Sequence, residues 1–370
     1  MARANTNLRI ASFPGDGIGR EIIPPALVLI EMLSKRLGGF SLSIEERLDC
    51  GATYYKESGC DCSTEAFEVA RGADAILLGA MGLPSVRLSS GTEAAPHLRM
   101  REEFGLSAGV RPVKAFANTP RRLLDERAAT IDLIVLRESS EGLFHTQGRG
   151  EVIDNREARE ILLVTRPITE RLCDTAFALA RKRKERGGKG RVTCVDKANV
   201  FNAFAFFRKI FDERAALNPD IRADHNYVDA MALDLVRKPW EFDVLVMENM
   251  FGDILSDLGG GLVGGMGMAP CAELGPEHGL FQPAHGSAPD IAGQDKANPT
   301  ATFLATAMML DWLAERHGIP HLAVAAGMLE RAIDRGFTEK RLRPMEFGGD
   351  QGLKAVTAAV IDLLGEEMVH

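Results

Sequence analysis

Short runs of aliphatic and β-branched residues recur along the chain, and longer amphipathic stretches separate several of them. The short runs predict strands at 8–13, 75–79, 133–136, 191–195 and 244–247. The amphipathic stretches predict helices at 19–37, 170–186, 301–315, 322–334 and 353–364. Because strands that alternate with helices form parallel sheets with helices on their faces, we predict an α/β protein with a largely parallel sheet and a mostly helical C-terminal third.

Size and charge narrow the class of protein. The chain has 370 residues, more than the ~250–300 at which a single core stops growing, so we expect two domains. The formal net charge of −8 argues against a nucleic-acid-binding protein, which needs a basic face to meet phosphates. No uninterrupted apolar run reaches the ~20 residues of a membrane helix. The polar stretch 1–8 lacks the apolar core of a signal peptide, so we expect a cytoplasmic protein without a membrane partner.

Two aspartates are the first candidates for chemistry. Asp253 and Asp257 are four residues apart in a segment that can form a helix, so both carboxylates would lie on one face. Two like charges held together favour a cation between them, and oxygen ligands suit Mg²⁺ or Mn²⁺. Asp229 can supply a third carboxylate. The alternative is that Asp253 caps a helix and that Asp257 is a surface residue.

Basic residues supply a second group of candidates. Lys197 follows the predicted strand 191–195, and active sites form at the strand ends of parallel sheets. A lysine near a metal can have a lowered pKa and act as a base, although a surface lysine is the simpler alternative. Arg101, Arg111 and Arg137 can clamp carboxylates beside a metal, but each taken singly can also be a surface residue.

Two loops have unusual composition. Gly15-Asp-Gly-Ile-Gly19 lies between a predicted strand and a predicted helix. It is not G-x-G-x-x-G, and no acidic residue at a clear second strand end completes a dinucleotide fingerprint, so it predicts a tight turn and only weakly a Rossmann domain. The segment 285–293, followed by Asn298, combines small residues, a proline and an aspartate in a loop against which a flat ligand could lie.

At these residues the chain resembles the β-decarboxylating dehydrogenases, which include the isopropylmalate, isocitrate, homoisocitrate, tartrate and D-malate enzymes. The matching motifs are Gly15-Asp-Gly-Ile-Gly19, Arg101 and Arg111, Arg137-Glu138, Asp196-Lys-Ala-Asn199, Tyr227-Val-Asp-Ala230, Asn249-Met-Phe-Gly-Asp-Ile-Leu-Ser-Asp257 and His285-Gly-Ser-Ala-Pro-Asp-Ile-Ala-Gly293. The resemblance covers nearly the whole chain. It implies the two-domain α/β fold of isopropylmalate and isocitrate dehydrogenases and not a Rossmann fold. One domain would combine 1–106 with 264–370, and the other would span 107–263.

The resemblance also implies a reaction. The substrate would be a (2R)-malate-type hydroxy acid such as 3-isopropylmalate, D-malate or tartrate, oxidised and decarboxylated with NAD and Mg²⁺ or Mn²⁺. The substrate carboxylates are assigned to Arg101, Arg111 and Arg137, the metal to Asp229, Asp253 and Asp257, and proton removal to Lys197. In this family the equivalents of Lys197 and Asp229 reach the site from the partner subunit, which implies a homodimer with shared active sites.

The cofactor site follows from the same resemblance. The residues assigned to it are Ile18, His285, Gly286, Ser287, Ala288, Asp290, Ile291 and Asn298. Asp290 would accept hydrogen bonds from the adenosine ribose, and its charge would repel a 2′-phosphate. Because NADP-using relatives carry Lys and Tyr at the positions of Asp290 and Ile291, we predict NAD.

The sequence departs from the family at several positions. The tyrosine expected seven residues after Arg137 is Phe144, so either His145 or a water would protonate the enolate. Gly109 replaces a usual asparagine and Gln282 a usual glutamate. In the stretch that sets substrate identity, His97 and Leu98 are candidate substrate contacts.

Three other functions remain as alternatives. The chain could be a non-catalytic regulatory paralogue that binds substrate and NAD, or an enzyme whose decarboxylation is impaired by Phe144. A phosphotransferase built on the aspartates would need a phosphate-binding loop, and none is seen.

Overall fold

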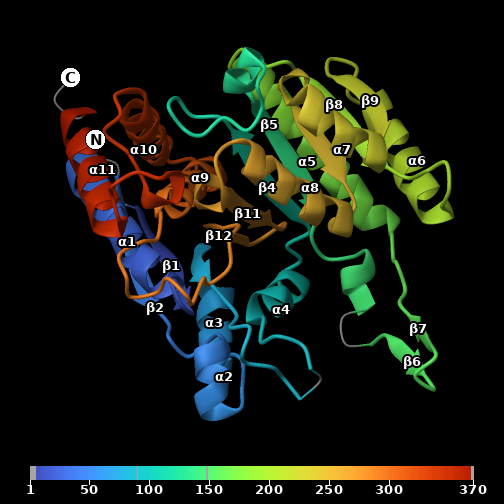
Figure 1. Ribbon diagram of the computed structural model, residues 1–370, viewed down its shortest axis with the longest axis horizontal. Helices are drawn as coiled ribbons and strands as arrows, with labels where there is room; N and C mark the ends of the chain where they lie inside the picture. Colours follow the sequence, from blue (N-terminus) through green and yellow to red (C-terminus); the bar gives the residue numbers. More distant parts are fainter. Residues whose placement is uncertain (1–5, 90, 147–148, 368–370) are drawn as a thin grey trace.

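The computed structural model describes residues 6–89, 91–146 and 149–367. Residues 1–5, which belong to the polar N-terminal stretch, lie outside the described residues. The described residues form a ten-stranded sheet in the order β2-β1-β3-β12-β11-β4-β5-β10-β8-β9 (Figure 1). Its strands are β1 Thr6–Gly15, β2 Phe40–Glu46, β3 Ala75–Ala80, β4 Ala108–Lys114, β5 Asp132–Glu138, β8 Arg191–Asp196, β9 Arg222–Tyr227, β10 Val244–Met247, β11 Pro270–Leu274 and β12 Gly279–Pro283.

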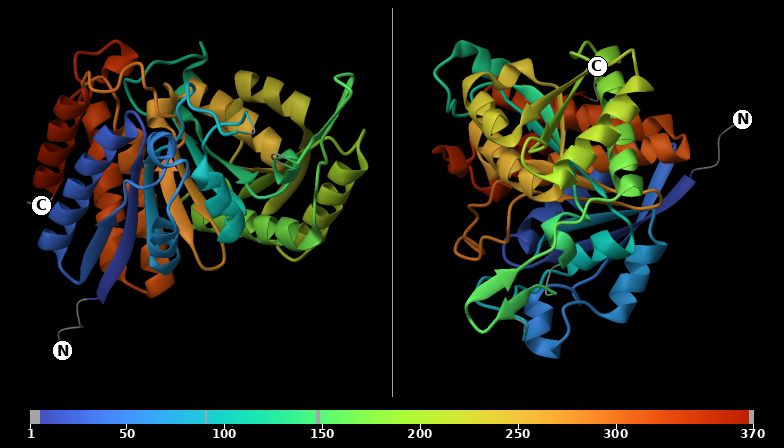
Figure 2. Two further views of the ribbon diagram at one scale, coloured as in Figure 1. Left: turned by 90° about the horizontal axis from the view of Figure 1, so that it is seen from below. Right: turned by 90° about the vertical axis from the view of Figure 1, so that its right-hand side faces the viewer.

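The remaining elements are helices and one small hairpin. The helices are α1 Gly19–Leu37, α2 Ala52–Ser58, α3 Thr64–Gly72, α4 Pro96–Glu103, α5 Arg166–Glu185, α6 Asn202–Ala216, α7 Val228–Arg237, α8 Asn249–Leu262, α9 Thr300–His317, α10 Pro320–Thr338 and α11 Leu353–Glu367. The hairpin of β6 Glu151–Ile153 and β7 Glu157–Arg159 projects away from the sheet (Figures 1 and 2). No helix among the described residues is long and apolar enough to cross a membrane.

The hydrophobic pattern predicted these elements well where a segment is strongly apolar or strongly amphipathic. All five predicted strands and all five predicted helices are present. The largely parallel sheet is confirmed, with six parallel strand pairs. Three antiparallel pairs at its centre were not predicted, because β11, β12 and β4 were not recognised as strands. The edge strand β9 was missed because its exposed, polar residues carry no hydrophobic run.

The strand order brings together segments that are far apart in the sequence. One half of the sheet uses strands from 6–80 and 270–283, and the other half uses strands from 108–247. The halves join where β11 pairs with β4. This interleaving agrees with a discontinuous first domain, whereas the division into domains at 106/107 and 263/264 stays a prediction.

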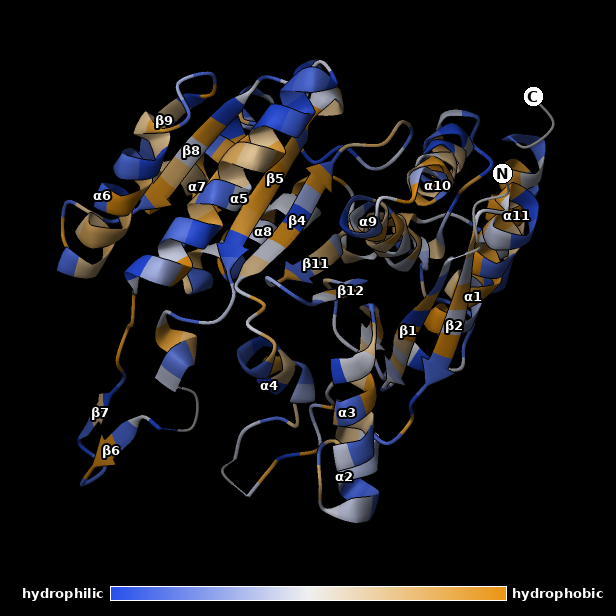
Figure 3. Cartoon of the chain, turned by 180° about the vertical axis from the view of Figure 1, so that it is seen from behind, coloured by the Kyte–Doolittle hydropathy of each residue, from blue (hydrophilic) through white to orange (hydrophobic). Residues whose placement is uncertain are grey.

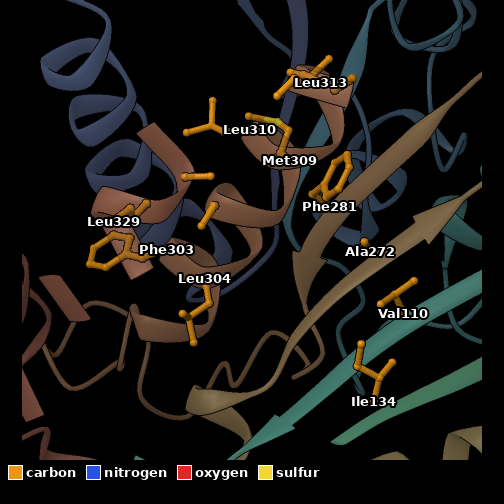
Figure 4. Packing of buried hydrophobic residues seen from close by; sticks show 14 of the residues in the cluster. Val110, Ile134, Ala272, Phe281, Phe303, Leu304, Met309, Leu310, Leu313 and Leu329 are labelled. Atoms are coloured by element: carbon orange, nitrogen blue, oxygen red, sulfur yellow. The ribbon is translucent and has the colours of Figure 1, made fainter. Parts of the chain in front are cut away.

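One face of the sheet is covered by a continuous hydrophobic core. The helices α1, α9, α5 and α6 lie directly on the strands, and α10 and α11 pack behind α9 and α1. In Figure 4, Val110, Ile134 and Ala272 of the central strands point toward the side chains of α9, which include Leu304. Because side chains alternate along a strand, the neighbours of these residues must point to the opposite face.

The opposite face carries two separate hydrophobic clusters. One lies under α3 and α4, and the other lies under α7 and α8. The central strands β11 and β4 run between them and present polar residues there. The candidate site therefore lies at the middle of the sheet, between α4 and α8.

Candidate active site

Three arginines from three elements meet at the middle of the sheet. Arg101 is on α4, Arg111 on β4 and Arg137 on β5, and their side chains are only 6%, 8% and 2% exposed. Arg137 lies directly opposite Gly109 in the β4–β5 pair, so Arg137 and Arg111 share one face of the sheet. The structure brings together these three arginines, which the sequence predicted as one group.

Arg137 is held in place by α8. Its Nε and Nη2 donate to Asn249 Oδ1 at 2.9 and 2.7 Å, and its Nη1 donates to Asp253. A Cβ atom at Gly252 would lie 2.6 Å from Arg137 Cβ, so only glycine lets the helix approach this closely. Burial, and then the charges of Arg111 and Arg101, lower the pKa of Arg137 to about 10, which leaves the guanidinium charged at neutral pH.

The aspartate pair lies on the same helix. Asp253 and Asp257 are one turn apart on α8, with 44% and 64% of their side chains exposed, and Arg111 Nη1 is 3.5 and 3.8 Å from their Oδ1 atoms. The prediction of a helix with both carboxylates on one face is confirmed. The alternative in which Asp253 caps the helix is wrong, because Glu248 is the N-cap and accepts from the backbone N–H of Phe251. Partial burial raises the pKa of Asp257, as does the charge of Asp253, while Arg111 lowers it.

Lys197 and Asp229 form a second pair, at the ends of β8 and β9. Lys197 Nζ is 2.5 Å from Asp229 Oδ1, and this hydrogen bond holds the pKa of Asp229 below its usual value. The Asp229 side chain is 68% exposed. The described residues of one chain contain no group of three acidic, histidine or cysteine side chains placed to hold a metal. One chain therefore joins Asp253 with Asp257 but does not add Asp229 to them.

Phe144 occupies a position beside the arginines. Its ring centroid is 5.0 Å from Cζ of Arg137, a cation–π contact. His145 follows it in the short 3₁₀ turn Leu143–Thr146, where it is half-buried and its carbonyl accepts from Arg149. The residue that replaces the expected tyrosine thus faces the site, and a role for His145 stays a prediction.

The candidate substrate contacts His97 and Leu98 are on α4, one turn before Arg101. Burial, and next the charge of Arg101, lower the pKa of His97 to about 3, so the imidazole is neutral at physiological pH. Leu98 is half-buried. Together they offer an uncharged wall beside Arg101.

The predicted cofactor residues largely share one cavity of about 580 Å³. Six of the eight line it, namely Ile18, His285, Gly286, Ala288, Ile291 and Asn298. Ser287 lies behind the wall, where its carbonyl accepts from the Ile18 backbone N–H at 2.8 Å and its Oγ donates to the carbonyl of Gly82. Asp290 is exposed and does not line the cavity.

The two predicted loops are in contact because a glycine allows it. Gly17 has φ +51°, and a Cβ atom there would lie 2.1 Å from the carbonyl oxygen of Ser287. The turn is anchored by the fully buried Asp16, whose carboxylate accepts from the backbone N–H groups of Ala52, Thr53 and Gly82. The prediction of a tight strand-to-helix turn is confirmed, and its aspartate serves the fold.

Several residues of the cavity wall were not predicted. They are Met266, Gly267, Lys296, Ala297, Met345 and Glu346. The Glu346 carboxylate accepts from Asn298 Nδ2 at 2.9 Å and from the Gly267 backbone N–H at 3.1 Å. These three residues come from distant segments with no shared motif, so nothing in the sequence pointed to their meeting.

The arrangement fits a small anion, an oxygen-bound cation and an elongated ligand. Residues 9–364 match the family model described as isocitrate/isopropylmalate dehydrogenase. The chain is 40% identical over 331 residues to a 3-isopropylmalate/3-methylmalate dehydrogenase of Methanocaldococcus jannaschii, covering 88% of this chain and 90% of that protein. It is 37% identical over 374 residues to a 3-isopropylmalate dehydrogenase of Chlorobium chlorochromatii, covering 97% and 99%.

The fold has a matching counterpart among solved structures. The crystal structure of isocitrate dehydrogenase from Methylococcus capsulatus superposes with a TM-score of 0.82 at 31% identity, covering 96% of this chain and 99% of that chain. The family match spans nearly the whole chain and includes every motif on which the resemblance rested. The chain therefore belongs to the isocitrate/isopropylmalate dehydrogenase family of β-decarboxylating enzymes.

Proposed function

We propose that this enzyme oxidises and decarboxylates a (2R)-malate-type 2-hydroxy acid, with NAD as the oxidant and Mg²⁺ or Mn²⁺ at the aspartate pair. The observation that supports it best is the meeting of three buried arginines with two carboxylates at the centre of the sheet. Arg111 and Arg137 would bind substrate carboxylates, since paired donors suit planar anions. Arg101 would complete this cradle of three arginines.

The residues present suit the metal and the cofactor. Asp253 and Asp257 offer only oxygen atoms, the ligands that Mg²⁺ and Mn²⁺ prefer, and their mutual repulsion favours a cation. The cavity lined by Ile18, His285 and Asn298 is large enough for part of a dinucleotide. When bound, the metal stabilises negative charge on oxygen and NAD accepts a hydride. The protein's own task is to hold the carboxylates and to remove the hydroxyl proton, which we assign to Lys197.

A homodimer with shared active sites is part of the proposal. Lys197 and Asp229 are separate from the aspartate pair of their own chain, so a partner could bring a second copy of them to it. Exposed apolar side chains gather near these residues on α7, on α8 and before α6, namely Phe201, Leu233, Val236 and Ile254. The projecting hairpin adds Val152, which is 74% exposed. Its strand β6 is coloured partly hydrophobic in Figure 3. Such patches mark protein–protein interfaces.

A substrate screen tests the proposal. D-malate, tartrate, 3-isopropylmalate, isocitrate and homoisocitrate should be offered with NAD and Mn²⁺ while NADH and CO₂ are both followed. We expect turnover of at least one malate-type substrate with one CO₂ released per NADH formed. NADH formation in excess of CO₂ would favour impaired decarboxylation. The structural reason would be Phe144, which stands in place of the expected tyrosine and contacts Arg137. Binding without any turnover would instead identify a regulatory paralogue.

Cofactor choice is tested at Asp290 and Ile291. Asp290→Lys with Ile291→Tyr replaces a charge that repels the 2′-phosphate by one that attracts it, so we expect the NADP-to-NAD ratio of kcat/KM to rise by about tenfold or more. Asp290→Asn alone, which removes the repulsion without adding attraction, should raise the ratio less. An unchanged ratio in the double variant would contradict the assignment of Asp290 to the ribose.

A further inference from the structure

A buried acid lies within the cradle of arginines. Glu273 on β11 is fully buried, and its Oε1 accepts from Arg101 Nη2 at 2.7 Å. Burial alone would raise the pKa of Glu273, but the charges of Arg101, Arg111 and Arg137 outweigh it and hold the pKa below its usual value. The carboxylate is therefore ionised at neutral pH. No role for it followed from any motif, although a single acid in an apolar strand was a visible signal.

The space for this carboxylate comes from Gly109. Glu273 and Gly109 are directly opposite in the β11–β4 pair, and Gly109 and Arg137 are opposite in the β4–β5 pair, so the three positions form one row on the site face. A Cβ atom at Gly109 would lie 3.0 Å from Glu273 Oε2 and 2.5 Å from Ser139 Oγ. A side chain at 109 and a carboxylate at 273 thus compete for the same volume.

The acid is only partly satisfied by the protein. Oε1 is paired with Arg101 and accepts from the Cys271 thiol at 3.5 Å. Oε2 lies above Gly109, the Ser139 hydroxyl is nearby, and Oε2 accepts no hydrogen bond of good geometry from the described residues. A buried carboxylate is costly unless cations compensate it, and the three arginines are the cations available. Glu273 therefore offsets one of the three positive charges that face the substrate.

We propose that Glu273 selects substrates by their charge, so that the site favours a dicarboxylate with an uncharged group on carbon 3 over a tricarboxylate. This inference rests on the proposed function. A third carboxylate entering beside Arg101 would approach the fixed negative charge of the buried Glu273. At a separation of roughly 7 Å and an effective dielectric constant of about 20, this repulsion corresponds to a preference on the order of tenfold to a hundredfold. Gly109 is the positioning residue that makes room for the acid.

The test compares Glu273→Gln with the wild type, using D-malate as the dicarboxylate and isocitrate as the tricarboxylate. The amide keeps an acceptor for Arg101 and removes only the charge. We expect the isocitrate-to-D-malate ratio of kcat/KM to rise by about tenfold or more, and calorimetric affinities for the two anions to shift in the same direction. Glu277→Gln is the matched control, because Glu277 lies between β11 and β12 with its side chain 77% exposed. It should leave both ratios unchanged.

The outcomes separate this inference from the proposed function. An unchanged affinity ratio in Glu273→Gln would overturn the inference, whether or not the enzyme turns over. A shifted affinity ratio without turnover of any substrate would support the role of Glu273 and contradict the proposed reaction. If Glu273→Gln does not fold, Gly109→Asn with Glu273→Ser refills the volume without the charge. The same shift is expected from that double variant, and its absence would overturn the inference.

Discussion

Replacing Asp253 with asparagine is expected to lower kcat/KM by about a thousandfold, because it removes half of the aspartate pair assigned to the metal. The Asp253 carboxylate is also paired with Arg137 and lies 3.5 Å from Arg111, so its loss leaves both arginines without a shared counter-charge. Activity measured against Mn²⁺ concentration, together with Mn²⁺ affinity by electron paramagnetic resonance, distinguishes a lost cation site from a slow chemical step.

Asp125→Asn is the control for this variant. Asp125 is paired with Arg127 at 2.7 Å in an exposed turn away from the site, so its loss should change neither activity nor metal affinity. Arg137 keeps its two hydrogen bonds to Asn249 when Asp253 is changed, and thermal unfolding should confirm that the variant is folded. Wild-type Mn²⁺ affinity in the Asp253→Asn variant would contradict the assignment of the metal site to α8.

Replacing Lys197 with methionine is expected to lower kcat by about a hundredfold to ten-thousandfold, the range for loss of a general base. Methionine keeps an unbranched side chain but has no ammonium group, so Asp229 loses its partner at 2.5 Å. NAD affinity should change little, because Lys197 does not line the cofactor cavity. Lys209→Met, which removes an exposed lysine from α6, is the control. Retention of the wild-type kcat by Lys197→Met would contradict its role as the base.

Mixing the two inactive variants tests whether the active sites are shared. If Lys197 acts on the aspartate pair of the partner subunit, a dimer of one Lys197→Met chain and one Asp253→Asn chain contains one intact site. Co-refolded or co-expressed variants should then regain part of the wild-type activity. If each site is built from a single chain, every site carries a defect and no activity returns. Sedimentation of the wild type checks the dimer itself.

The sequence predicted the structure best where neighbouring residues alone determine the local conformation. The stretch 19–37 is amphipathic along its whole length, and α1 has these bounds in the structure. The glycines at 15 and 17 predicted a turn that the structure contains, since positive φ angles favour glycine wherever the chain folds. The spacing of Asp253 and Asp257 placed both on one face of a helix, because residues four apart in a helix are neighbours on its surface.

The site was predicted only as far as motifs describe it. Arg101, Arg111 and Arg137 were grouped from the sequence and lie together, and six of the eight predicted cofactor residues line one cavity. Asp229, the predicted third metal ligand, is separate from Asp253 and Asp257 in one chain. The resemblance assigned Asp229 to the partner subunit, and the homodimer that would bring it to the aspartate pair stays a prediction.

By itself, the sequence determined the helices and the strongly apolar strands, the turn glycines, and the set of residue types that the chemistry needs. Only the tertiary structure decided that β11 pairs with β4, which places Glu273 above Gly109 and beside Arg101. It also decided that Gly267, Asn298 and Glu346 meet at one cavity wall. The physical reason is that propensity, periodicity and capping act over a few residues, whereas strand order and the compensation of buried charge depend on contacts between segments far apart in the chain.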